Sequence, residues 1–162
     1  MVVHFTTPSL VAVAAGVVGS AWTSGAMASF SFGGVPSARA VAPTSAQVWR
    51  ELYNRGVNIM PKAAVLIGTV YAYAAYDCRR LGGYWAGFVA AAAATMSIGP
   101  FTLFVMKPTN DKLHRAAKKE PGFDQTQVSA LMQTWEKLNY MRCSLPLLGS
   151  LVGIWTFYHN AV

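Results

Sequence analysis

The sequence predicts an all-α integral membrane protein, a bundle of four transmembrane helices with helical extensions into the cytosol. Three observations predict this class. Hydrophobic residues make up 54% of the 162 residues and charged residues only 12%, whereas soluble domains carry about 25% charged residues. The mean hydropathy is +0.34. The apolar residues also gather in long blocks, and the length suits one compact domain over residues 1–162.

Four apolar blocks are the predicted spans, and they cover residues 9–32, 60–76, 84–106 and 143–159. About 17–25 apolar residues cross a bilayer. The first block has no basic segment before it and exceeds the roughly 7–15 apolar residues of a secretion signal, so we expect a retained helix. A soluble four-helix bundle is the alternative. It is disfavoured because the first and third blocks carry no charge and leave no polar face for water.

The connection between the first two spans is predicted to contain a short surface helix. Thr44 followed by Gln47 is typical of a capping box. One face of the helix would carry the apolar and aromatic residues Val48, Trp49, Leu52 and Tyr53. Such a helix would lie on the membrane or against the bundle.

The third and fourth helices are predicted to extend past the membrane. Gly99 and Pro100 should kink the third helix before it continues through PTNDKLH. Asp124 and Gln127 form a second cap-like start, from which the fourth helix should run into the membrane and bend near Pro146.

The two ends of this bundle differ in charge. The side with both termini carries Arg79 and Arg80, and the other side carries eleven basic residues, so both termini are expected on the non-cytosolic side. The non-cytosolic side should also hold an aromatic belt of Tyr71, Tyr73, Tyr76, Tyr84, Trp85, Trp155 and Tyr158. Cys78 and Cys143 would lie at opposite faces, so we expect two free thiols.

The expected partners are the lipid bilayer and a small molecule. A net charge of +7 suggests nucleic acid first, but the basic residues lie between apolar blocks and no nucleic-acid motif is present. Gly16 and Gly19 in the first span and Gly149 and Gly153 in the fourth suit close helix contacts. These contacts could form within one chain or between two chains, so the sequence is compatible with a monomer or a homo-oligomer.

Polar residues from three segments should converge at the cytosolic end. The candidates are Thr109, Asn110, Asp111 and His114 from the third helix, Trp135, Asn139 and Arg142 from the fourth, and Trp49, Tyr53 and Arg55 from the connection. Asn110 and His114 are one helical turn apart, and the three residues of the fourth helix share a face. Plainer interpretations exist for some of them. Asp111 could form a surface ion pair, and the two tryptophans could be interfacial anchors.

Metal and nucleophile chemistry find little support in the sequence. Of the three histidines, His4 and His159 are predicted at the far end, which leaves His114. One histidine with Asp111 and two amides is a weak donor set for Zn, Fe or Cu, so no metal ligands are predicted. Cys143 has no histidine nearby in sequence, and phosphate-binding glycine motifs are absent.

Two runs resemble the anthrone oxygenase family of fungal polyketide pathways, PFTLFVMKPTNDKLH at 100–114 and WEKLNYMRCSLPLLGSLVG at 135–153. VWRELYNRGVNIMPKAA at 48–64 fits the same family. The resemblance extends from about Trp22 to Trp155. The residues that match its motifs are Pro108, Thr109, Asn110, Leu113, Trp135, Asn139 and Arg142.

The resemblance implies oxidation of an anthrone by O₂ to the anthraquinone, with emodin anthrone or norsolorinic acid anthrone as the type of substrate. From the chemistry, His114 or Asp111 would be the base. The amides Asn110 and Asn139 would join Arg142 in stabilising the oxyanion, and the substrate would be bound by Trp135, Thr109, Trp49, Tyr53 and Arg55. A deprotonated anthrone can reduce O₂ directly, so we expect no cofactor, with a metal or haem as the alternative.

Family and topology together indicate the endoplasmic reticulum or another endomembrane. The alternative function is a non-enzymatic scaffold that holds pathway enzymes at a membrane, with the polar end as its docking surface. A small transporter is a third interpretation. It is disfavoured because ionisable residues are nearly absent from the spans.

Overall fold

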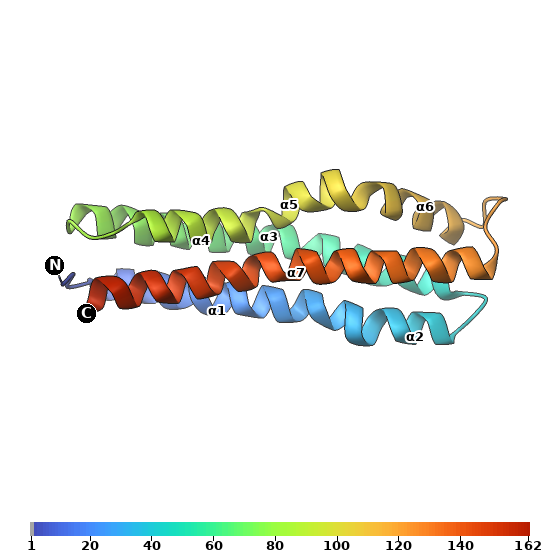
Figure 1. Ribbon diagram of the computed structural model, residues 1–162, viewed down its shortest axis with the longest axis horizontal. Coiled ribbons are helices and arrows are strands. Elements are labelled where there is room, and N and C mark those ends of the chain that lie inside the picture. The colour runs from blue at the N-terminus through green and yellow to red at the C-terminus, as the bar shows by residue number, and fades with distance from the viewer. Residues whose placement is uncertain (1) are drawn as a thin grey trace.

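The computed structural model describes residues 2–162, and over this range it is helical without strands. Four long rods run alternately up and down, with both termini at one end (Figure 1). The rods are α1–η1–α2 (Thr7–Ser29, Phe30–Gly34, Val35–Ala40), α3 (Ser45–Arg80), α4–α5–η2–α6 (Ala86–Met96, Ile98–Phe101, Thr102–Met106, Lys107–Ala117) and α7 (Gln125–Ala161). The first and third rods each pack against α3 and α7, so the bundle is square in section.

Three of the four rods, Thr7–Ala40, Ser45–Arg80 and Ala86–Ala117, are long and apolar enough to cross a membrane. The prediction of membrane-length helices is confirmed for these rods. α7 is as long, at 37 residues, and packs along α1 and α4. Its membrane crossing stays a prediction.

The prediction of a separate short helix between the first two spans is wrong. α3 begins at Ser45 and continues without a break to Arg80. The Thr44 side chain caps nothing, because its hydroxyl donates to the carbonyl of Val41 at 2.8 Å. Gly56 and Pro61 lie inside α3 without ending it, because an internal glycine only weakens a helix and an internal proline removes one helical hydrogen bond.

The predicted extensions of the third and fourth helices are confirmed. Asp124 and Gln127 form the capping box that starts α7, with the Asp124 carboxylate accepting from the Gln127 amide at 2.7 Å. The helix then continues past Pro146. In the third rod, α4 ends at Met96, and α5 and the π-helical segment η2 connect it to α6. The interruption falls at Ser97, two residues before the expected Gly99 and Pro100, which lie inside α5.

Small residues bring the rods together in the centre of the bundle. A Cβ atom on Gly16 would lie 2.7 Å from the Tyr71 ring, and one on Gly153 would lie 2.4 Å from the Tyr71 hydroxyl. Tyr71 is fully buried and donates to the carbonyl of Gly149 at 3.1 Å. Its assignment to the aromatic belt is therefore wrong: the glycines leave a hole that its ring fills.

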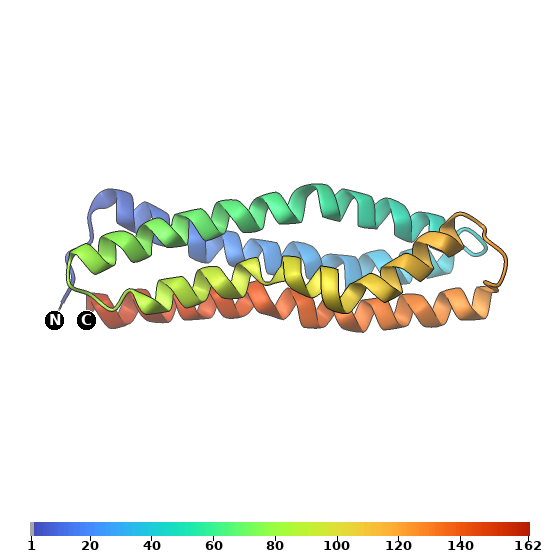
Figure 2. The ribbon, with the colours of Figure 1, turned by 90° about the horizontal axis from the view of Figure 1, so that it is seen from above.

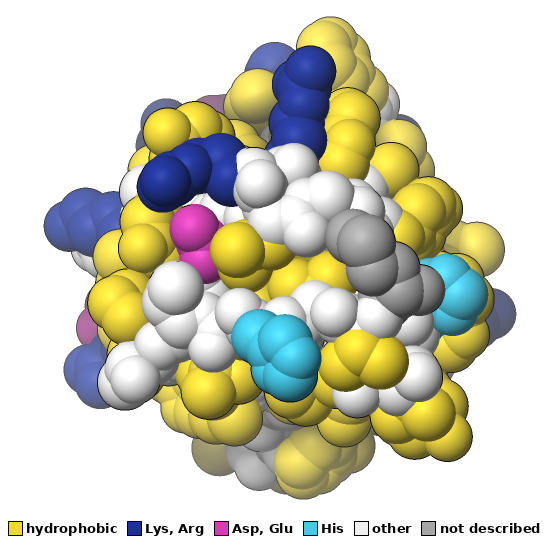
Figure 3. Space-filling model, turned by 90° about the vertical axis from the view of Figure 1, so that its left-hand side faces the viewer, with side chains coloured by type: hydrophobic (Ala, Val, Ile, Leu, Met, Phe, Trp, Pro, Cys, Tyr) yellow, Lys and Arg dark blue, Asp and Glu magenta, His cyan; other side chains and the backbone are white. Residues whose placement is uncertain are grey.

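The end with the termini exposes mainly hydrophobic and uncharged side chains (Figure 3). The other six residues of the predicted aromatic belt are exposed. Arg79 lies 5.2 Å from the ring of Trp85, and Arg80 lies 3.9 Å from the buried Asp77 carboxylate. Both cysteines are free, as predicted, and both are buried.

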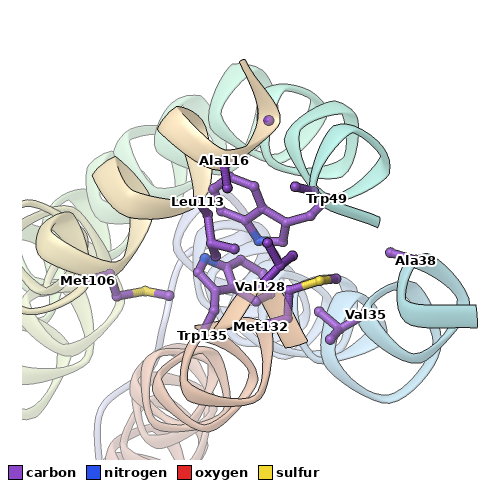
Figure 4. Packing of buried hydrophobic residues seen from close by; sticks show 11 residues of the cluster. Val35, Ala38, Trp49, Met106, Leu113, Ala116, Val128, Met132 and Trp135 are labelled. Carbon is purple, nitrogen blue, oxygen red and sulfur yellow. The ribbon is translucent and has the colours of Figure 1, made fainter. Parts of the chain in front are cut away.

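The opposite end has its own hydrophobic core, formed by the extensions of all four rods (Figure 4). Trp49 of α3 and Trp135 of α7 meet edge to face at its centre, with ring centroids 6.0 Å apart. Leu113 of α6 packs against them. Because both indoles are buried, at 0% and 3% exposure, neither is an interfacial anchor, and the core fixes the positions of the polar groups beside it.

Candidate active site

A cavity of about 250 Å³ lies where the apolar part of the bundle meets this second core. Its walls are mainly apolar, with Met27, Phe30, Met60 and Ile98 among them. Each of the two facing rods has a proline near the cavity, because Pro61 of α3 lines it and Pro100 of α5 follows the lining residue Gly99. Each proline removes a helical hydrogen bond. Figure 2 shows α3 and the third rod farthest apart in the middle of the bundle, and the cavity occupies this region.

Arg142 is the charged residue in the cavity wall. Its Nη1 donates to the hydroxyl of Thr102 at 3.0 Å, and its Nη2 donates to the side-chain oxygen of Asn139 at 2.5 Å. The Nε atom is buried and has no hydrogen-bond partner. Each terminal nitrogen of the guanidinium is therefore held by one hydrogen bond, and the buried Nε–H has no partner.

Asn139 is held from the other side by the first rod. Its amide nitrogen donates to the carbonyl of Met27 and to the hydroxyl of Ser31, each at 2.7 Å. These donors leave the amide oxygen directed at Arg142. Asn139 is fully buried, so this chain of hydrogen bonds fixes the guanidinium against three rods.

A second buried amide, Asn110, supports Trp135. Asn110 accepts the indole N–H of Trp135 at 3.0 Å and is 4% exposed. Trp135 lines the cavity, and the Arg142 guanidinium lies 6.0 Å from its ring. Asn110 itself does not line the cavity. It orients the wall beside the guanidinium.

His114 lies behind the cavity wall, in the extension beyond the apolar block 84–106. Its ring packs edge to face on Tyr53 at 4.8 Å and on Trp49 at 5.1 Å. Tyr53 lines the cavity, so one aromatic ring separates His114 from the cavity. Burial lowers the pKa of His114, and the positive charges of Arg50 and Lys118 act in the same direction against the opposing effect of Asp111. The imidazole is therefore neutral at pH 7 and can accept a proton.

The other predicted site residues lie away from the cavity. Asp111 is exposed and forms an ion pair with Lys107 at 2.7 Å. Arg55 is exposed and pairs with Glu51 at 3.0 Å. Thr109 is half-buried on α6 and lines no part of the cavity, and Trp49 belongs to the core behind it.

Thr102 is one of the site residues that the sequence reasoning missed. It lies in η2, accepts from Arg142 and donates to the carbonyl of Ile98 at 2.7 Å. A signal was present, because Thr102 is one of the few polar residues in the uncharged block 84–106, and such residues face other helices in membrane bundles. π-helical turns are also common at functional sites.

Metal-binding side chains do not cluster anywhere in the described range. Within residues 2–162, no group of three or more His, Cys, Asp and Glu side chains could hold a metal ion. The polar groups at the cavity are instead a guanidinium, a hydroxyl and a phenol.

The fold and the cavity define a class: a small helical protein with membrane-length rods and a buried arginine beside an apolar cavity. Residues 49–152 match the anthrone oxygenase family. The anthrone oxygenase AgnL2 of Paecilomyces divaricatus is 36% identical over 88% of this chain and 92% of its own length. The anthrone oxygenase tpcL of Aspergillus fumigatus is 31% identical over 90% of this chain and 92% of its own.

The chain therefore belongs to the anthrone oxygenase family and is an oxygenase. A shorter match, 30% identical over 65% of this chain, joins it to the noranthrone monooxygenase of Aspergillus flavus. No solved structure matches the chain. Arg142, Asn139, Trp135 and Asn110 all lie in the matched region.

Proposed function

We propose that the protein oxidises a polyketide anthrone to the corresponding anthraquinone with O₂, at the cavity beside Arg142. The observation that carries this proposal is the buried guanidinium whose Nε has no partner at the wall of an apolar cavity. A flat phenolic ketone matches such a site, because its rings suit apolar walls and its oxygen suits a cationic donor. The names of the relatives support the same substrate class.

The first step is loss of a proton from the methylene group between the two aromatic rings of the anthrone. The product is an anion whose negative charge resides largely on the ketone oxygen. A donor aimed at this oxygen favours the anion more than the ketone. In our proposal Arg142 Nε donates to it, while Thr102 and Asn139 keep the guanidinium in place.

The base is proposed to be His114. The two candidates for the base are the carboxylate of Asp111 and the imidazole of His114. Asp111 pairs with Lys107 at the surface, whereas His114 packs on the cavity-lining Tyr53. A neutral imidazole suits a base near pH 7. Closer approach to the substrate requires movement of the Tyr53 ring or relay of the proton by water.

The second step consumes one O₂. The anion passes an electron to O₂, and recombination forms a carbon–oxygen bond at the former methylene carbon, which gives a hydroperoxide after protonation. Loss of the remaining C–H proton and cleavage of the O–O bond release water and leave a carbonyl group. One oxygen atom enters the product and the other becomes water, so no external reductant is needed.

Membrane placement forms part of the proposal. We propose that α7 crosses the bilayer with the other three rods, because it packs along α1 and α4 over the same length. Both termini would then face the non-cytosolic side of an endomembrane. Anthrones and O₂ both partition into lipid, so the cavity would draw both reactants from the membrane.

The decisive experiment uses the purified full-length protein in liposomes, treated with a chelator and supplied with an anthrone and ¹⁸O₂. We expect quinone to form faster than in protein-free liposomes, with one ¹⁸O atom per quinone and O₂ consumed one for one. A rate equal to that of the liposome blank would refute the oxygenase proposal. Activity that returns only with added iron, copper or haem would refute the cofactor-free mechanism.

A further inference from the structure

The cavity beside Arg142 is open on one side. Two residues of its lining are strongly exposed, Leu103 of η2 at 63% and Val57 of α3 at 45%. Other lining residues are buried, such as Met27 at 0% and Trp135 at 3%. The opening therefore lies between α3 and the α5–η2 segment, on the side of the bundle.

The third-rod side of this opening is apolar, whereas the α3 side also carries the exposed polar residues Asn54 and Asn58. Phe104 and Val105, next to Leu103, are 81% and 46% exposed. The third-rod side belongs to the block 84–106, which has no charged residue. Such a surface suits acyl chains rather than water.

Two glycines line the cavity, Gly56 on α3 and Gly99 on α5, and Gly99 lies four residues before the exposed Leu103. A Cβ atom on Gly99 would have no heavy atom within 4 Å, so space for a side chain is left unfilled there. A Cβ atom on Gly56 would be in ordinary contact with Phe30 at 3.5 Å. The missing side chain of Gly99 widens the opening, and that of Gly56 leaves room inside the cavity beside Phe30.

We propose that the anthrone enters sideways from the bilayer between α3 and α5–η2, and that Gly99 determines which substrates pass by setting the width of this opening. The inference rests on the proposed function. It adds the route and the residue that limits the size of the substrate. Gly99 precedes Pro100, and a Cβ atom on the residue before a proline disfavours the helical backbone conformation. The Gly99→Ala variant measures this effect apart from the effect of side-chain size.

The first test is a series of increasing side-chain volume at position 99. From Gly99→Ala through Gly99→Leu to Gly99→Phe, we expect kcat/KM for anthrone oxidation to fall stepwise. The fall should reach about 10–100-fold at Phe, because the larger side chain occupies space that the entering substrate needs, and overpacking of this kind costs about 1–3 kcal/mol, with each tenfold worth about 1.4 kcal/mol. A more heavily substituted anthrone should be affected more than unsubstituted anthrone. Gly25→Phe is the matched control. Gly25 is exposed in α1, away from the cavity, and also has no heavy atom within 4 Å. Wild-type kcat/KM in folded Gly99→Phe would overturn the proposal.

The second test needs no turnover. A nitroxide label at Leu103→Cys, in a background with Cys78 and Cys143 replaced by Ala, is measured in liposomes for collisions with O₂ and with a water-soluble nickel complex. We expect its collision rates with O₂ and with the nickel complex to match those of a label at Val18→Cys, which is exposed to lipid in α1. They should differ from the collision rates of a label at Asp111→Cys. Nickel collisions as frequent as at position 111 would overturn a lipid-facing opening. A wild-type protein that forms no quinone would instead refute the proposed function.

Discussion

Replacement of Arg142 tests the proposed chemistry most directly. Arg142→Met keeps a long apolar chain but removes all the N–H donors. If Nε stabilises the anthrone oxyanion, kcat should fall by about 10²–10³, the usual effect of losing one such donor. KM should change less, because the neutral ketone gains less from the cation than the anion does.

The same replacement has a structural cost that can be worked from the contacts. The oxygen of the fully buried Asn139 loses its donor, which costs about 1–3 kcal/mol. The free-energy cost at Thr102 is smaller, because its hydroxyl still donates to the carbonyl of Ile98. Arg142→Lys keeps the charge but cannot donate to both residues as the forked guanidinium does, so it should recover only part of kcat.

The assay is the initial rate of quinone absorbance in liposomes, corrected for spontaneous oxidation of the anthrone. Thermal unfolding in detergent measures how much folded protein each variant retains. Lys137→Ala is the control, because Lys137 is exposed on the same helix and lies away from the cavity. A folded Arg142→Met protein with kcat within about threefold of wild type would refute the oxyanion argument, since the expected loss is at least tenfold greater.

Three further predictions concern the base, the support of the guanidinium and the packing. His114 must be neutral to act as a base, and burial lowers its pKa below the ordinary 6.5. Activity should therefore be constant near pH 7 and fall as the pH drops below 6.5. In His114→Gln this loss of activity at acidic pH should be absent. An unchanged loss in that variant would exclude His114. Thr102→Val removes an acceptor from the guanidinium and should lower kcat by up to about 100-fold, while Thr102→Ser should restore it; equal rates for the two variants would show that the hydroxyl has no role. Gly153→Leu should lower the free energy of unfolding by about 1–3 kcal/mol, because its Cβ would lie 2.4 Å from the hydroxyl of Tyr71. Thermal unfolding beside the open-site control Gly25→Leu checks this, and equal stability of both would contradict the packing argument.

The rods and their extensions were predictable from the sequence because each depends on local signals. Uncharged blocks of bilayer length indicate membrane helices, and the capping box at Asp124 marks where α7 begins. The start of α3 directly after Thr44 was placed correctly, and its continuity was missed because Asn54, Arg55 and Gly56 separate its two apolar stretches. The spacing of Thr44 and Gln47 also suggested a capping box. In the structure, Thr44 bonds back to Val41 instead. Local spacing shows where a cap could form, and the preceding turn decides whether it does.

The site was only partly predictable, because helical periodicity shows which residues share a face and not what that face contacts. Asn139 and Arg142 were placed together correctly from their spacing along α7. Asp111 has the right chemistry and a position near the cavity in sequence, but the rotation of α6 turns it to the surface. Thr102 comes from another rod, and its contact with Arg142 depends on how η2 is wound, which spacing does not reveal.

The location of Arg142 follows from what a cation near hydrocarbon requires. A charged group at membrane depth costs about 2.5–3.5 kcal/mol by insertion scales, so it persists only with polar partners or a role. Thr102 and Asn139 give each terminal nitrogen one acceptor, and the buried Nε has none. A protein that needed Arg142 only for packing would gain by replacing it with an apolar side chain, since the cavity walls are already apolar. A buried donor without a partner, on a residue that lines a cavity, is instead the arrangement that we propose an anionic oxygen completes, and this links the cost of the buried charge to the reaction.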